Sequence, residues 1–139
     1  MSLDILAEFR SQFLIFLDEL IAQFPDEGDI VILRLFVSTQ MSADDMVKKF
    51  LYELDSHEGS KRVAIKERDE SFFLDYSLNH DTADLFKISH FKKLWNSGQL
   101  DDEDKRIFWQ WMDTFMFLAD KYTKSLVKEM NPDNENNGS

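Results

Sequence analysis

Cysteine is absent from this chain of 139 residues, and glycine and proline are scarce, with four and two residues. A chain without cysteine forms neither disulfide bonds nor a cysteine-ligated zinc site, so a reducing compartment suits it. Scarce glycine leaves little material for the loops that hold nucleotide phosphates. Because glycine and proline are also the residues that most often interrupt helices, their scarcity favours long helices with few tight turns.

Basic residues are the minority among the charged ones: 16 lysines and arginines stand against 27 acidic residues, which gives a net charge of −11. Such a chain repels the phosphates of nucleic acids and anionic membranes, so we expect neither direct nucleic-acid binding nor membrane attachment. No run reaches the roughly 18 apolar residues of a membrane span. The first apolar stretch contains Asp4, Glu8 and Arg10, which is atypical of a signal peptide, so we expect an intracellular location.

What the chain does have is material for a hydrophobic core. Hydrophobic residues make up 43% of the sequence and aromatic residues 14%, including 13 phenylalanines, which is more than a disordered chain carries. A single domain of this length buries roughly two-thirds of the surface of the extended chain. We predict one helical domain over residues 1–130 and a disordered polar tail over residues 131–139.

Apolar residues recur three or four positions apart between Ser2 and Phe24, which predicts a first helix that ends at Pro25 and Gly28. The next run, residues 30–40 (IVILRLFVSTQ), contains enough β-branched residues to suggest a strand. We favour a buried helix instead, because no second strand is evident and a lone strand would leave its backbone groups unpaired.

Caps and turn residues predict further helices. Ser42 and the acid three residues after it have the spacing of a capping box and predict a helix over residues 43–55. A loop over residues 55–62 should follow. An apolar stripe over residues 85–95 predicts another helix, and Gly98 supplies the left-handed residue that suits its end.

The last predicted helix, residues 101–130, is the longest. It opens with four carboxylates that suit an N-terminal cap and the positive end of the helix dipole: Asp101, Asp102, Glu103 and Asp104. These elements predict an all-α fold, a compact bundle of about five helices with a long C-terminal helix; whether residues 63–89 are helical throughout stays open. One core should contain Phe9, Phe13, Leu17, Leu20, Phe50, Leu54, Phe91, Trp95, Trp111, Phe115 and Tyr122.

Candidate catalytic residues are few. Four residues faintly resemble the acids and lysine of a nuclease, but their spacing matches no motif: Lys66, Glu67, Asp69 and Glu70. The histidines are not spaced as paired metal ligands: His57, His80 and His90. We predict no catalytic, cofactor-binding or metal-ligating residue, and a metal-dependent hydrolase using the acids of residues 66–70 is the enzymatic alternative. One stretch is locally basic and is interpreted as solvated or ion-paired rather than as an anion site: Lys61, Arg62, Lys66 and Arg68.

The last predicted helix has more apolar residues than one face can hold. At about 100° per residue, Trp109, Met116 and Val127 form a second stripe beside the main apolar face, and Phe117 stands almost opposite that face. We favour a central helix covered on two sides; alternatively the stripe docks another protein, because aromatic residues and methionine are common at interfaces. We expect Trp109 to be buried and Phe117 partly exposed, so the candidate protein-docking surface is Met116, Phe117 and Val127.

Three segments resemble a known group of proteins: FLDELIAQFPDEGDI, IKERDESFFL and FKKLWNSGQLDDEDKRIFWQWMDTFMFLADKY. In the last and densest of them, an acidic helix start is followed by W-x-W, an acid, an apolar run and a Lys-Tyr pair. Over most of residues 13–122 the chain is similar to small helical proteins, without an assigned activity, of nucleocytoplasmic large DNA viruses, the giant viruses of algae and protists. The resemblance implies a viral protein that acts inside the infected cell or in the virion, and it supplies no catalytic residues.

These observations predict a non-enzymatic protein that acts through protein–protein interaction, with a partner of unknown identity or a second copy of itself. No cofactor and no small-molecule substrate are inferred. An acidic inhibitor that mimics nucleic acid is the main alternative, and it would need carboxylates with phosphate-like spacing on one exposed face.

The charge balance makes a prediction about DNA. The chain should show no appreciable affinity for duplex DNA at about 150 mM salt, because neutralising phosphates requires a basic surface. A fluorescence anisotropy titration checks this expectation, and micromolar or tighter binding would contradict the charge argument.

Overall fold

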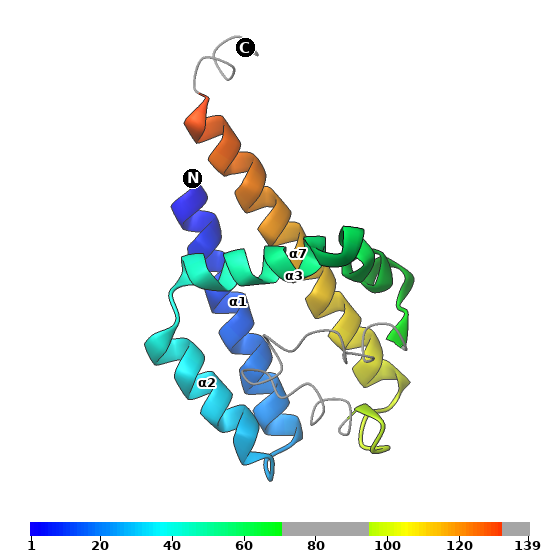
Figure 1. Ribbon diagram of the computed structural model, residues 1–139. Coiled ribbons are helices and arrows are strands. Elements are labelled where there is room, and N and C mark those ends of the chain that lie inside the picture. Colours follow the sequence, from blue (N-terminus) through cyan, green and yellow to red (C-terminus); the bar gives the residue numbers. More distant parts are fainter. Residues whose placement is uncertain (71–94, 132–139) are drawn as a thin grey trace.

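The computed structural model describes residues 1–70 and 95–131 (Figure 1). Over these residues the chain forms four α-helices and no strand: α1 (Ser2–Gln23), α2 (Gly28–Gln40), α3 (Ala43–Glu67) and α7 (Asp102–Met130). The all-α prediction and the long C-terminal helix are confirmed for this part of the chain. The predicted number of about five helices is corrected to four there, since the helix predicted over residues 85–95 lies, except for Trp95, outside the described residues.

The first two helices begin and end close to the predicted positions. α1 ends where the Phe24 N–H donates to the Leu20 carbonyl at 2.8 Å, immediately before Pro25, which has no N–H to continue the helix. α2 includes residues 30–40, so the prediction of a helix for this run, rather than a strand, is confirmed. The backbone groups of this run are satisfied within the helix, and no second strand is needed.

α3 contains a kink where the sequence predicted a longer loop. Its N-terminus is capped by Ser42, whose hydroxyl accepts a hydrogen bond from the Asp45 N–H at 3.1 Å. Residues 56–59 depart from helical geometry, and three of them have left-handed backbone: His57, Glu58 and Gly59, with φ of 52°, 61° and 76°. The loop predicted over residues 55–62 is therefore confined to this kink, and the helix resumes and continues to a left-handed cap at Arg68.

α7 begins with a complete capping box, as its run of acids predicted. The Asp101 carboxylate accepts from the Asp104 N–H at 2.8 Å, and the Asp104 carboxylate accepts from the Asp101 N–H at 3.2 Å. The preceding turn contains Gly98 at φ 84°, the left-handed conformation predicted there. Residues 132–139 of the predicted tail and Phe91 of the predicted core lie outside the described residues.

α1 and α7 lie side by side and antiparallel, and α3 crosses both of them (Figure 1). At one end of this pair, the Ser2 N–H and hydroxyl donate to Glu129 at 3.0 and 2.7 Å. Farther along, the indole N–H of Trp111 donates to Glu19 at 2.8 Å. α2 packs on the other side of α1, so that α1 lies between α2 and α7.

The core is an aromatic cluster around Phe115 of α7, which is 1% exposed. The centroid of its ring lies 5.5–6.1 Å from those of five other rings: Phe9, Phe13, Phe16, Phe50 and Trp111. Six of the predicted core residues are buried: Phe9, Leu17, Leu54, Trp95, Phe115 and Tyr122. Four others pack against the cluster while partly exposed: Phe13, Leu20, Phe50 and Trp111.

Truncation of the central ring should be costly. Phe115→Ala should lower the free energy of unfolding by about 3–5 kcal/mol, because it removes a buried ring and leaves a cavity among its neighbours. Phe117→Ala is the matched control on the same helix, since Phe117 is 64% exposed and its truncation should change stability by no more than about 0.5 kcal/mol. Urea denaturation measures both values, and equal losses would show that Phe115 is peripheral.

The kink of α3 makes a second prediction about stability. Gly59→Ala should cost about 1–2 kcal/mol, because the added Cβ meets no atom within 4 Å but is strained at φ 76°. Glu58→Gly, at φ 61°, should instead stabilise by up to about 1 kcal/mol, because glycine relieves the same strain at some entropic cost. Thermal denaturation checks the opposite signs; a loss of stability in both variants would contradict a left-handed kink.

Candidate protein-docking surface

α2 is apolar on both of its sides, but only its inner side is covered. Val37 is completely buried, and Leu33 packs against the core. On the outer side four large apolar residues are exposed at 40–66%, and we call them the α2 face: Val31, Ile32, Leu35 and Phe36. At about 100° per residue, these four positions share one side of the helix.

Polar contacts hold α2 against α1 and leave the α2 face outward. The Arg34 side chain donates to Asp18 of α1 at 2.5 Å, and Arg10 of α1 donates to the Ser38 carbonyl at 2.8 Å. The hydrogen bond with Asp18 raises the pKa of Arg34. Among the described helices, α2 packs extensively only against α1, which covers its inner side. No described helix therefore packs extensively over the α2 face.

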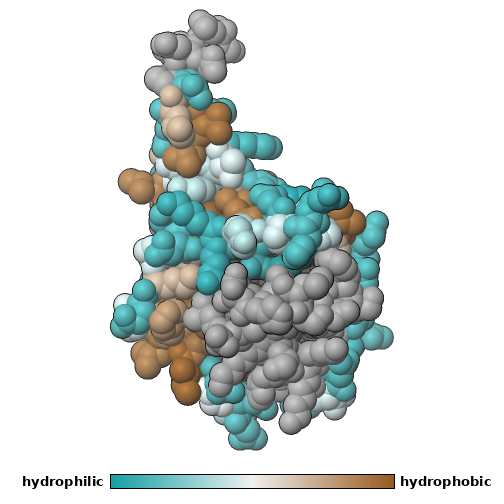
Figure 2. Space-filling view, in the orientation of Figure 1, coloured by the Kyte–Doolittle hydropathy of each residue, from teal (hydrophilic) through white to brown (hydrophobic). Residues whose placement is uncertain are grey.

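The α2 face is uncharged. α2 contains two charged residues, Asp29 in its first turn and Arg34 on the side that meets Asp18. Figure 2 shows the resulting apolar patch, in brown, over the α2 region at the lower left of the view. From the exposed fractions, its area is on the order of 400 Å², which lies within the range of about 300–600 Å² that is typical of the largest apolar patch on a monomer, a patch that is often functional.

The structure corrects the interpretation of residues 30–40 as a buried helix, because the inner side is buried and the outer side is not. A helix that is apolar all round is usually surrounded by neighbours. The sequence signal that could have revealed the exception is the low charge of this run on a chain that is 31% charged. Periodicity alone did not show which of its sides a neighbour covers, so the α2 face was missed.

The predicted docking residues of α7 are not gathered into one patch. Met116 is partly buried against the core, whereas Phe117 and Val127 are 64% and 52% exposed. Ten positions separate the two exposed residues, which places them about 80° apart around the helix and about 15 Å apart along it. Trp109 is buried as expected, with the Arg68 guanidinium 5.8 Å from the centroid of its ring.

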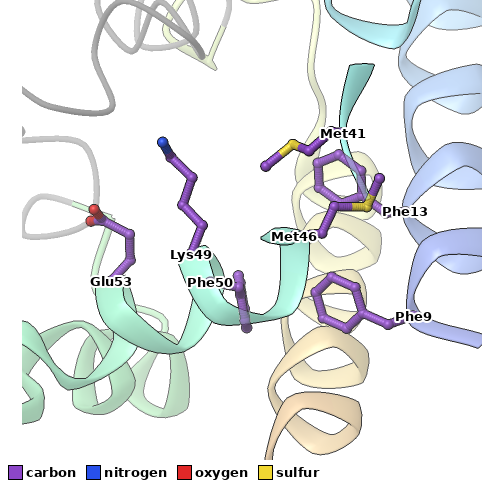
Figure 3. Close-up of a pocket in the computed structure, with 7 residues that line it drawn as sticks. All are labelled: Phe9, Phe13, Met41, Met46, Lys49, Phe50 and Glu53. Carbon is purple, nitrogen blue, oxygen red and sulfur yellow. The ribbon is translucent and has the colours of Figure 1, made fainter. Parts of the chain in front are cut away.

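A small apolar pocket lies between α1 and the start of α3 (Figure 3). In Figure 3 the rings of Phe9 and Phe13 and the two methionines occupy one end, and Lys49 and Glu53 extend at the other. Its volume of about 80 Å³ is well below the roughly 300 Å³ of the smallest usual ligand sites, so it suits packing rather than ligand binding. It is lined by Phe9, Phe13, Met41, Met46, Lys49, Phe50 and Glu53.

The locally basic stretch is ion-paired at three of its four basic residues, so the predicted ion pairing is confirmed there. Three of its side chains pair with acids: Lys61 with Glu53, Arg62 with Asp55 and Asp120, and Arg68 with Asp113. Lys61 is 5% exposed, and this burial lowers its pKa, while the hydrogen bond with Glu53 acts in the opposite direction. Lys66 is exposed.

The acids of the described residues do not converge on a metal site. Within residues 1–70 and 95–131, no group of three or more histidines and acids is arranged to hold a metal ion. Glu70 accepts a hydrogen bond from the Trp95 indole N–H and lies 3.7 Å from the Lys105 amine. Of the histidines, His57 is at the kink of α3, and the other two lie outside the described residues: His80 and His90.

No helix in the described part of the chain combines the length and apolarity of a membrane span. No protein-family model, curated protein or solved structure matches the chain.

Proposed function

We propose that this protein is a non-enzymatic interaction protein that docks a protein partner through the α2 face. The observation that carries the proposal is the exposure of Ile32 and Leu35, 66% and 62%, on an uncharged surface of a chain with net charge −11. Apolar surface left in water costs about 25 cal/mol per Å² relative to burial. A partner that covers the α2 face recovers this free energy.

The distribution of charge around the α2 face matches that of an interface. Interface centres are depleted in charged residues, and their rims are polar. Here Val31 and Phe36 flank the most exposed residues, while Asp29 and the Arg34–Asp18 pair lie outside the apolar centre. This arrangement supports docking by apolar contact at the centre with polar contacts at the edge.

The nucleic-acid-mimicking alternative depends on free carboxylates rather than on apolar residues. Several acids are instead engaged by basic side chains of the same chain: Asp113 by Arg68, Asp120 by Arg62 and Glu103 by Arg106. Each such pair reduces the negative potential that a decoy would present. The decoy also gives the α2 face no role, so docking through that face is the better-supported function.

The sequence resemblance adds a biological setting to the proposal. We infer that the interaction takes place in a cell infected by a giant virus or in its virion. One resembling segment, FLDELIAQFPDEGDI, includes the connection between α1 and α2, which sets α2 against α1. No catalytic role, cofactor or small-molecule substrate is proposed.

Site-specific photo-crosslinking tests docking through the α2 face. The full chain with p-benzoylphenylalanine in place of Leu35 should form a discrete protein adduct when the cells that express it are irradiated, because a docked partner lies within reach of this position. The adduct should disappear when Ile32→Glu is introduced into the same chain, because a carboxylate at the centre of an apolar contact loses its hydration without gaining a partner. Mass spectrometry of the adduct is the measurement.

The same photoreactive residue at position 117 or 127 is the control for the α7 residues. Both positions are exposed and lie outside the α2 face. Adducts at these positions without an adduct at position 35 would place docking on α7 and contradict the proposal. The lack of an adduct at all three positions would contradict an interaction function.

A further inference from the structure

We propose that the partner on the α2 face is a second copy of this chain, packed as an antiparallel pair of α2 helices around a two-fold axis. This inference rests on the proposed function, because it identifies the occupant of the same surface. A two-fold interface places the same patch on both copies, so one exposed apolar face is sufficient to form it. Each copy then covers the apolar surface that the other leaves in water.

The size of the α2 face fits such a pair. Each partner in an interface of standard size loses roughly 800 Å² of accessible surface, of which somewhat more than half is apolar. The four residues of the α2 face supply on the order of 400 Å² of apolar surface. The polar remainder can come from adjoining residues such as Thr39 and Gln40, which are exposed and uncharged.

The charge distribution selects the antiparallel orientation. Two copies with a net charge of −11 repel each other, but the helices that meet carry no charge on the α2 face. The N-terminal end of α2 is acidic and its C-terminal end is uncharged: Asp26, Glu27 and Asp29 stand at one end, and Ser38, Thr39 and Gln40 at the other. Antiparallel packing sets each acidic end beside an uncharged end, whereas parallel packing would bring the acidic ends together.

The length of α2 also limits the repulsion. With 13 residues it is about 20 Å long, so antiparallel packing separates the two acidic ends by about that distance. The Debye length is about 8 Å at physiological ionic strength, so repulsion between the two ends is largely screened. At low ionic strength the Debye length is longer, about 30 Å at 0.01 M, so the repulsion between the ends grows, and salt added to a dilute buffer should strengthen this association.

A two-fold axis at the middle of the α2 face pairs its residues reciprocally. With the axis between positions 33 and 34, Ile32 lies opposite Leu35 of the second copy, and Val31 lies opposite Phe36 of the second copy. Val31 and Leu35 form one row of residues spaced four positions apart, and Ile32 and Phe36 form another. Rows of this spacing interlock in the commonest class of helix packing. Because position 35 is close to this axis, charges introduced at position 35 of the two copies would lie close to each other.

Sedimentation velocity of the purified full chain, from micromolar to millimolar concentration, tests the inference. Monomer and dimer should be in a concentration-dependent equilibrium. The dimer should tighten when sodium chloride is raised from about 50 mM to about 500 mM, because salt screens the repulsion between two acidic copies. An association held by a basic surface would weaken over the same range, so weakening would contradict the inference.

Charge variants at position 35 test the face and its symmetry. Leu35→Glu and Leu35→Lys should each weaken the dimer at least about 100-fold, because like charges meet across the axis. A mixture of the two variants should restore a dimer, because opposite charges then meet on the same face. Phe117→Glu is the matched control: it places a carboxylate at an exposed aromatic position outside the α2 face and should leave the dimer unchanged. Circular dichroism and thermal melting check that each variant folds.

Three outcomes would overturn self-association: a chain that stays monomeric, a dimer that survives Leu35→Glu, or a mixture that fails to restore the dimer. The crosslinks from position 35 separate this failure from failure of the docking function. An adduct with a different protein excludes the second copy but keeps the docking function. An adduct with twice the mass of the chain supports the inference.

Discussion

The packing of α1 against α7 around Phe115 is the interaction on which the rest of the structure depends. Rings from α1 and α3 meet Phe115 of α7, and such rings bury large apolar areas while interlocking in tilted and edge-on pairs. Hydrogen bonds from Ser2 to Glu129 and from Trp111 to Glu19 fix the two helices along their length. Because α7 occupies one side of α1, α2 packs on the other.

α3 packs against both α7 and α1. The kink at residues 56–59 lets its two halves follow different directions, and the second half is tied to α7 by Arg68, which pairs with Asp113. Arg68 also lies over the ring of Trp109, which packs against the ring of Trp95 and is buried, whereas Phe117 remains in solvent. α3 lies across α1 and α7. Among the described helices, α1 is the one that packs extensively against α2, so one side of α2 is covered.

The acidic charge of the chain and the uncharged α2 face act together. A net charge of −11 keeps copies of the protein apart in most orientations and opposes non-specific association. The α2 face, with its exposed Ile32 and Leu35, is a place where another surface can approach without meeting a charge. In the proposed docking, specificity would come from the surrounding repulsion as well as from the apolar contact, because wrong orientations bring like charges together.

Local information in the sequence was sufficient for α1 and α7, for the caps of α3 and α7 and for most of the aromatic core, but it did not predict the second half of α3. The periodicity that defines α1 and the spacing of Asp101 and Asp104 act within a few residues of the chain. The kink was only partly visible, since Gly59 alone among its left-handed residues signals that conformation. Which side of α2 stays in solvent was decided by the tertiary structure. Periodicity describes one helix about its own axis, whereas burial depends on contacts with helices that are distant in the sequence.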